Sequence, residues 1–378
     1  MNDGVDVQDM KHVFDGGSLL QRIPWPKYYT YKSLCDLYVE YVHRNIPNVS
    51  PLVVFDGYSS GPSTKDETHL IREGGVVGVD VEVDPNMILN MKKKLFLLGS
   101  ILQDNGIHTK HAVADADLDI ALSACQIAST SPVVVVAHDT DVLVLLLHHV
   151  KQHHRTIILK TTTKAPIQVN TMQKELGFDI CSSILFLHAI TGCDTVSKPF
   201  GLGKMMSIKK AKSLTIYSAT FLEREASCSD VETAGERALA VLFGCQDLNA
   251  GRKDKFTDKV LKKYVDPERL PPTADAARFH SRRVYQQAQE WCGNKLDPTK
   301  WGWVNQVSSR GGLVLRQVKM ELAPAPAGLL LMIRCKCAGR CDGMRCSCKK
   351  NGLLCTAACG QCKGLCANGG IDIELDSE

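Results

Sequence analysis

Seven aspartates in this chain stand within or just after short apolar segments, at a spacing that could build a metal site. An aspartate follows each of three apolar segments, either directly or after one residue: His12–Phe14, Leu52–Phe55 and Val133–Ala137. A short loop separates a fourth apolar segment, Ile184–Leu187, from a further aspartate. Hard divalent cations such as Mg²⁺ prefer carboxylate oxygens, and paired ions are a recurring device for phosphodiester hydrolysis. The candidate carboxylates are Asp15, Asp56, Asp115, Asp117, Asp139, Asp141 and Asp194.

These segments predict the sheet that would position the carboxylates. Short apolar runs bounded by polar residues indicate buried parallel strands, and ligands gather at the carboxyl ends of such strands. All four runs are therefore expected to be strands. Segments with the apolar spacing of a helix alternate with these strands, at Tyr31–His43, Met87–Asn105 and Leu118–Ala128. The alternation predicts an α/β fold.

The acidic pair Asp115 and Asp117 falls in or just before the first turn of the predicted helix Leu118–Ala128. The amino terminus of a helix stabilises negative charge there.

The chain is predicted to contain one large domain, a helical extension and a small cysteine-rich domain. Prolines at 267, 271 and 272 interrupt the helical extension, and a Gly-Gly pair with an Ala-Pro repeat indicates a linker after it. The expected boundaries are 1–215 for the α/β domain, 216–300 for the extension, 301–334 for the linker, 335–367 for the cysteine-rich domain and 368–378 for a tail.

Length and charge leave the class of partner open. The chain has 378 residues and a net charge of +4, so only local basic clusters could indicate nucleic-acid binding. The polar, acidic start of the chain does not resemble a secretory signal, and no run approaches the ~20 apolar residues that span a bilayer. A soluble intracellular protein without a membrane partner is expected.

Nine of the 16 cysteines are concentrated between positions 335 and 366. In a reducing compartment such density indicates metal rather than disulfides. Zinc takes four thiolates, and nine thiolates saturate three zinc ions if three of them each bridge two ions. The predicted ligands are Cys335, Cys337, Cys341, Cys346, Cys348, Cys355, Cys359, Cys362 and Cys366.

The acidic motifs resemble, in order, those of the flap endonuclease (XPG) branch of the PIN-like nucleases. The resemblance spans about the first 210 residues and rests on Phe14-Asp15, Phe55-Asp56-Gly57, Asp115-Ala116-Asp117, Asp139-Thr140-Asp141 and Gly192-Cys193-Asp194. It implies a twisted parallel sheet with helices on both sides and two Mg²⁺ ions that activate water for in-line attack on a phosphodiester. It further implies one ion bound by Asp15, Asp56, Asp115 and Asp117, and the other by Asp139, Asp141 and Asp194.

Two further segments extend this resemblance to the substrate. Lys65 and Arg72, seven residues apart, resemble the basic pair that the family places over the scissile phosphate. After Asp194, the segment with Gly201, Gly203, Lys204 and Lys209 resembles the helix-hairpin-helix that grips duplex backbone, where N–H groups and lysines contact phosphate.

The cysteine spacing resembles the CXC domain of tesmin-type chromatin proteins, which bind DNA. By that resemblance Arg345, Lys349 and Lys350 would contact phosphates. The alternative is a zinc domain that only stabilises itself or binds protein. The combination resembles animal proteins of mobile-element origin, and a nuclear location is expected.

Two functions remain open. The first is a DNA nuclease with a tethered zinc domain, with RNA as a possible substrate of the same site. The second is a non-catalytic DNA-binding or chromatin protein that retains the nuclease fold. One departure bears on the choice: the family usually has Glu-x-Glu where this chain has Asp115-Ala116-Asp117, each acid one methylene shorter.

Overall fold

The computed structural model describes residues 10–23, 31–46, 50–57, 63–64, 85–113, 115–161, 164–260, 270–307, 313–323, 334–338, 340–355 and 359–369. Of these, the side chains of residues 31, 85–94 and 256–260 are not described. No helix among the described residues is long and apolar enough to cross a membrane.

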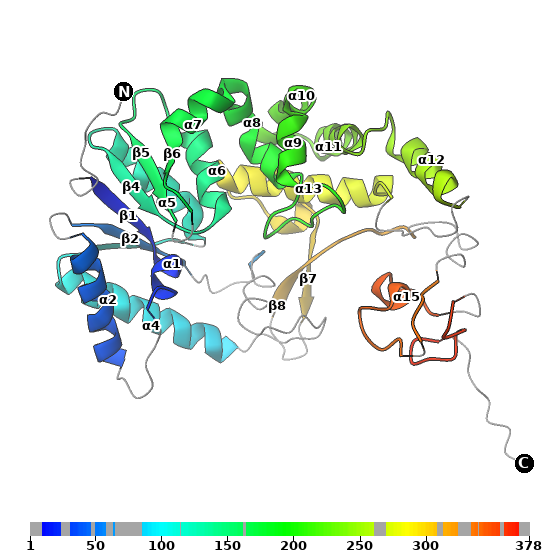
Figure 1. The fold of residues 1–378 in the computed structure, drawn as a ribbon, viewed down its shortest axis with the longest axis horizontal. Coiled ribbons are helices and arrows are strands. Elements are labelled where there is room, and N and C mark those ends of the chain that lie inside the picture. The colour runs from blue at the N-terminus through cyan, green and yellow to red at the C-terminus, as the bar shows by residue number, and fades with distance from the viewer. Residues whose placement is uncertain are drawn as a thin grey trace, which may run out of the picture.

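A six-stranded sheet in the order β3-β2-β1-β4-β5-β6 forms the first half of the molecule (Figure 1). Its neighbours pair in parallel except β6, which runs antiparallel to β5. In register, Val13 of β1 pairs with Leu52 of β2 on one side and Val135 of β4 on the other. The strands are β1 (Lys11–Asp15), β2 (Leu52–Phe55), β3 (His108–His111), β4 (Val133–Val136), β5 (Ile157–Lys160) and β6 (Ile167–Gln168).

Helices cover both faces of the sheet, as the sequence predicts. Alternate strand residues point to opposite faces: Phe14 packs in a cluster with α2 (Tyr31–Asn45) and α4 (Pro85–Asp104). Val13 packs in the other cluster with α5 (Ala116–Ala128) and α6 (Thr140–His149). The predicted helices α2, α4 and α5 are confirmed, and so is the α/β fold class with a mostly parallel sheet.

The prediction of a strand at Ile184–Leu187 is wrong. These residues lie in α8 (Phe178–Ala189), which is buried among α6, α10 (Ala211–Leu222) and α13 (Ala274–Trp291). A helix surrounded on most sides is apolar on most sides, so its sequence lacks the one-sided periodicity that distinguishes helix from strand. Asp194 therefore follows a helix and a loop.

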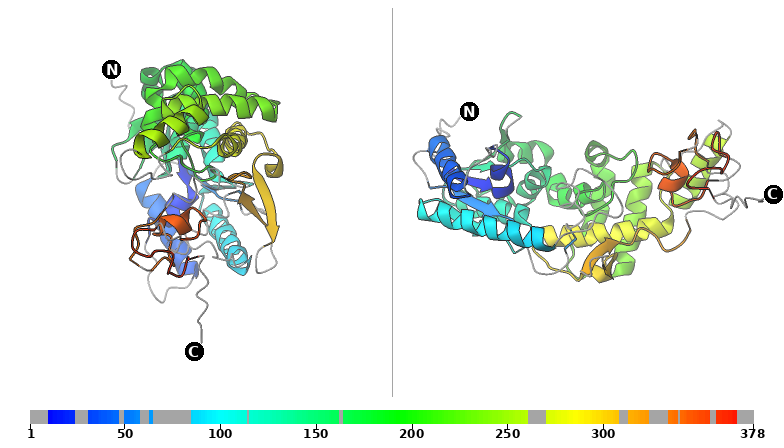
Figure 2. Two further views of the ribbon diagram at one scale, coloured as in Figure 1. Left: turned by 90° about the vertical axis from the view of Figure 1, so that its right-hand side faces the viewer. Right: turned by 90° about the horizontal axis from the view of Figure 1, so that it is seen from below.

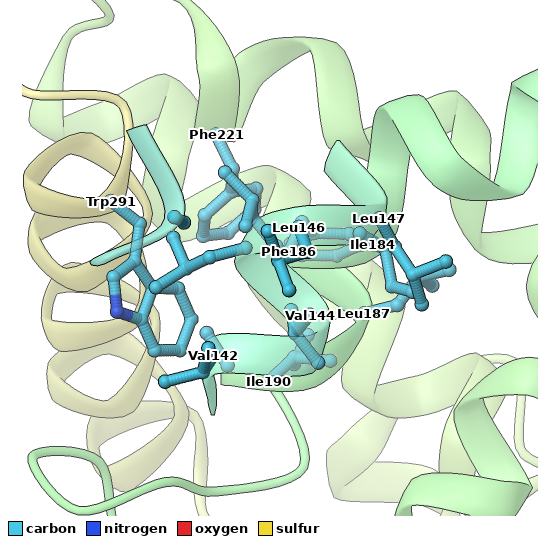
Figure 3. Packing of buried hydrophobic residues seen from close by; sticks show 14 of the residues in the cluster. Val142, Val144, Leu146, Leu147, Ile184, Phe186, Leu187, Ile190, Phe221 and Trp291 are labelled. Carbon is cyan, nitrogen blue, oxygen red and sulfur yellow. The ribbon is translucent and has the colours of Figure 1, made fainter. Parts of the chain in front are cut away.

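The second half of the molecule is helical, and its core continues that of the sheet. Figure 3 shows Phe186 of α8 beside Phe221 of α10, with their ring centroids 4.5 Å apart, and Trp291 of α13 in the same cluster. Sheet residues such as Val135 belong to this cluster too. The remaining helices are α7 (Val169–Leu176), α9 (Lys204–Lys209), α11 (Cys228–Phe243), α12 (Leu248–Val260) and the 3-10 helix η3 (Pro298–Lys300).

Within the segment predicted as a linker, the chain instead forms an antiparallel hairpin of β7 (Trp303–Val307) and β8 (Leu313–Gln317). The Gln317 amide donates to the Thr195 carbonyl at 3.1 Å, which joins the hairpin to the loop after α8. Trp303 is buried. The hydrogen bond that anchors the hairpin joins residues 122 positions apart, which spacing along the chain does not reveal.

The cysteine-rich segment lies at the far end of the molecule from the sheet, below α12 in Figure 1 and at the same end in the right-hand view of Figure 2. Its one helix among the described residues is the four-residue α15 (Ser347–Lys350).

Candidate metal centres

Three aspartates stand at the carboxyl edge of the sheet, after the three central strands. Asp15 ends β1 and begins α1 (Gly16–Leu20), where its Oδ1 accepts a hydrogen bond from the Gly17 N–H at 2.8 Å. Asp56 follows β2, and Asp139 follows β4 as the N-cap of α6. Because β1 lies between β2 and β4, the three carboxylates share one edge.

The charges of these three side chains act on one another. Burial raises the pKa of Asp15 to about 6; the charges of Asp56 and Asp139 add to this rise, and the Ser18 and Gly17 N–H groups oppose it. A Cβ atom placed on Gly17 would lie 3.3 Å from Oδ1 of Asp15 and 4.0 Å from Oδ2 of Asp56. Crowded negative charge of this kind is relieved by a bound cation, and carboxylate oxygens suit Mg²⁺.

The start of α5 joins this edge through one hydrogen bond. Oδ1 of Asp56 accepts from the Ala116 N–H at 2.9 Å, which fixes the first turn of α5 against the end of β2. Asp115 is the N-cap of α5 and Asp117 lies in its first turn, as predicted, with Asp117 buried. Asp115 and Asp117 are thus the sequence neighbours of Ala116, the residue whose N–H donates to Asp56.

A second acidic group lies between α6, α8 and the loop after α8. Asp141, in the first turn of α6, is buried and pairs with Nε2 of His188 at 2.8 Å. Lys204 donates from Nζ to the carbonyls of His188, at 2.6 Å, and Gly192. Burial lowers the pKa of Lys204, and the charges of Cys193, Asp141 and, most weakly, Asp194 oppose that shift.

The sequence interpretation assigned no role to His188. It is a polar residue in the apolar segment Ile184–Ile190, and a polar side chain there requires a buried partner. The need for such a partner is the signal in the sequence that could have indicated a role for His188. It does not show that the partner is Asp141.

The candidate carboxylate ligands and the candidate cysteine ligands differ in how closely their ligand atoms lie together. Among the described residues, the groups of three or more His, Cys, Asp or Glu ligand atoms within 4.8 Å of one another are all made of cysteines. The carboxylates are therefore spread more widely than the ligands of one closed site.

The predicted DNA-contacting residues near α9 lie in different environments. Gly201 adopts a φ of +78°, Gly203 is the N-cap of α9, and Lys209 is exposed. Lys204 instead turns inward toward the two carbonyls described above. Lys65 and Arg72 lie outside the described residues.

All nine cysteines predicted to bind zinc come together in one cluster. Their Sγ atoms are spaced as zinc would require: 3.8 Å from Cys335 to Cys341 and to Cys355, and 3.6 Å from Cys348 to Cys359. Tetrahedral zinc with bonds of about 2.3 Å places its sulfur ligands ~3.8 Å apart.

Four sets of four sulfurs meet the spacing that one ion needs. These sets are Cys335, Cys337, Cys341 and Cys346; Cys341, Cys355, Cys362 and Cys366; Cys335, Cys346, Cys348 and Cys355; and Cys335, Cys355, Cys359 and Cys362.

Basic side chains surround this cluster at the surface. Arg345, Lys349 and Lys350 are exposed, and Nζ of Lys349 donates to the Asp342 carbonyl at 2.6 Å. Seven of the nine cysteines are buried and Cys337 and Cys366 are half-buried, so exposed side chains such as these, rather than the sulfurs, lie at the surface.

Neither a protein-family model nor a curated protein matches the sequence. Similar solved structures include the T5 D15 protein co-crystallised with metal ions, at 13% identity and a TM-score of 0.40 over 75% of this chain and 98% of that one. The catalytic core of Rad2 in complex with a DNA substrate has 17% identity and a TM-score of 0.38, over 74% and 79% of the two chains. Human GEN1 in complex with Holliday junction DNA has 13% identity and a TM-score of 0.38, over 75% and 70%. Values this low do not establish a family for this chain.

Proposed function

We propose that this protein is a Mg²⁺-dependent, structure-specific DNA nuclease of the PIN-like type. The observation that carries the proposal is the placement of Asp15, Asp56 and Asp139 at one edge of the mostly parallel sheet, after its three central strands. The order of the acidic motifs in the sequence, which resembles that of the flap endonucleases, supports the choice of phosphodiesters as substrate.

In this proposal Asp15, Asp56, Asp115 and Asp117 hold one Mg²⁺ ion. The other set, Asp139, Asp141 and Asp194, holds the second. Bound Mg²⁺ would lower the pKa of the attacking water and stabilise negative charge on the phosphate oxygens. The chain's own part is to fix the ligands: the Gly17 and Ala116 N–H groups orient Asp15 and Asp56, and His188 orients Asp141.

We further propose three zinc ions in the cysteine cluster. Cys335 and Cys355 each occur in three of the four sets of closely spaced sulfurs, and Cys341 shares a set with each of them, so these three would be the bridging ligands. The remaining pairs, Cys337 with Cys346, Cys362 with Cys366, and Cys348 with Cys359, would complete the three ions. The exposed Arg345, Lys349 and Lys350 would then bind DNA phosphates, in a nuclear protein of mobile-element origin.

The test is cleavage of labelled flap, nicked and single-stranded DNA, and of matched RNA, with and without Mg²⁺. We expect cleavage by the wild type, and loss of several orders of magnitude in rate for Asp139→Ala plus Asp141→Ala. A matched control is Asp119→Ala, because Asp119 pairs with Lys110 at 2.8 Å on the surface. Cleavage by the double variant at the wild-type rate would refute the assigned site.

The second candidate is a non-catalytic DNA-binding protein that retains this fold. The wide spacing of the carboxylates favours it, since no three of their oxygens in the described residues lie within 4.8 Å of one another. It predicts DNA binding that needs the cysteine domain, with no cleavage of any substrate in Mg²⁺ or Mn²⁺.

A further inference from the structure

A cavity of about 530 Å³ lies beside the carboxylate edge and is lined by Gln21, Arg22, Tyr41 and His138. Two of these residues connect directly to the proposed site. His138 precedes Asp139 in the chain, and Gln21 is the C-cap of α1, the five-residue helix that Asp15 begins. The cavity is therefore one short helix away from the carboxylates.

Arg22 lines this cavity and has unused hydrogen-bonding capacity. Its Nη1 donates to the Tyr41 hydroxyl at 3.2 Å, but its Nε and Nη2 are shielded from solvent and have no hydrogen-bond partner in the described part of the chain. None of the ion pairs between described residues includes Arg22. Shielded guanidinium N–H groups that lack a partner among the described residues are costly, so the position of Arg22 calls for a ligand.

The lining defines the chemistry of that ligand. An amide, a phenol, an imidazole and a guanidinium can all donate hydrogen bonds, and no carboxylate is among the described residues that line the cavity. The planar guanidinium matches two oxygens of a phosphate at once. A phosphate there would also place a nucleic acid strand next to Asp15 and Asp139.

We propose that the Arg22 cavity is a phosphate subsite, which holds a nucleic-acid phosphate next to the one at the carboxylates. The inference rests on the proposed function and adds a substrate contact to it. The phosphate comes either from within the strand or from its 5′ end, and the experiment separates these two sources.

The experiment measures binding by fluorescence anisotropy without added divalent metal, so that cleavage does not interfere. The probes are oligonucleotides with a 5′-phosphate or a 5′-hydroxyl. We expect Arg22→Ala to weaken binding roughly tenfold, the loss of one charge-assisted contact. The slope of log K against log salt should fall by about 0.7 to 0.9. Arg22→Lys should keep the slope and recover only part of the affinity.

Arg44→Ala is the matched control, because Arg44 is an exposed arginine on α2, the helix of Tyr41, and pairs with Glu40 instead of facing the cavity. Equal losses for Arg22→Ala and Arg44→Ala would overturn the subsite. A loss confined to the 5′-phosphorylated probe assigns the cavity to a terminal phosphate, and equal loss on both probes assigns it to an internal one.

Thermal unfolding separates a binding role from a structural one. Arg22→Met removes an unpartnered cation, so its Tm should equal or exceed that of the wild type, while pyrophosphate should raise the Tm of the wild type alone. A lower Tm for Arg22→Met together with unchanged DNA affinity would make Arg22 structural and overturn the inference.

The failure of the subsite and the failure of the proposed catalysis give different results. If the wild type binds DNA through Arg22 but cleaves nothing, the proposed catalysis fails and the subsite stands. If the wild type cleaves DNA and Arg22→Ala binds it normally, the subsite alone fails.

Discussion

At the scale of single residues, the proposed site depends on the groups that hold the aspartates as much as on the aspartates. Asp15 and Asp56 each accept a hydrogen bond from a backbone N–H, and Asp141 bonds to the buried His188. Partners of this kind orient a metal ligand and commonly change metal affinity by about 10–100-fold when removed. His188 is the only one of these partners that is a side chain, so it can be tested by mutation.

We expect His188→Ala to weaken Mn²⁺ binding by about 10–100-fold and to lower stability, because it removes the 2.8 Å partner of the buried Asp141 carboxylate. His188→Asn keeps a donor near Asp141 and should restore part of the affinity. Paramagnetic Mn²⁺ titration and the Tm measure the two effects. His153→Ala is the control, since His153 is exposed; equal metal affinity in wild type and His188→Ala would rule out the positioning role.

At the scale of elements, close contacts at glycines fix how helices meet the sheet edge. A Cβ atom on Gly16, the first residue of α1, would lie 2.3 Å from Cδ1 of Phe55 and 2.8 Å from the Val54 carbonyl oxygen. Helix α1 can therefore pack against β2 only with glycine at this position. Both Asp15 and the Arg22 cavity depend on that packing.

Gly16→Ala should push α1 away from β2, with a loss of stability of about 1–3 kcal/mol. It should also weaken Mn²⁺ and DNA binding together, because Asp15 and Arg22 flank the displaced helix. Chemical denaturation and the two binding assays measure these changes. Gly343→Ala is a control with open space around the new Cβ, and a Gly16→Ala protein with unchanged binding would show that α1 does not position the site.

At the scale of the whole molecule, the chain has cores of two kinds. The largest cluster of buried apolar residues runs from the sheet into α13, whereas the cysteines form a cluster of their own that shares no residue with it. So small and cysteine-rich a segment has little apolar surface to bury and depends on metal to fold. The main body should therefore be stable without the cysteine domain.

Metal analysis should find about three zinc ions per chain, and two or fewer would reject the bridged cluster. A zinc chelator should unfold the cysteine domain and remove its contribution to DNA affinity. The thermal transition of the main body should stay unchanged, as followed by circular dichroism. A chelator that lowers this transition would show that the two parts fold together.

The sequence by itself determined the features that depend on local pattern. The valines of β4, the helical spacing of α2, α4 and α5, and the acidic pair at the start of α5 follow from periodicity and helix capping, which neighbouring residues fix. The nine clustered cysteines likewise indicated metal from composition alone.

Only the tertiary structure decided which groups meet. The segment before Asp194 is a helix whose apolar residues lie on most of its sides because α6, α10 and α13, which are separate elements of the chain, surround it. The bond between His188 and Asp141 spans 47 positions, and that between Arg22 and Tyr41 spans 19. Contacts between such distant residues arise from packing, so no local pattern in the sequence encodes them.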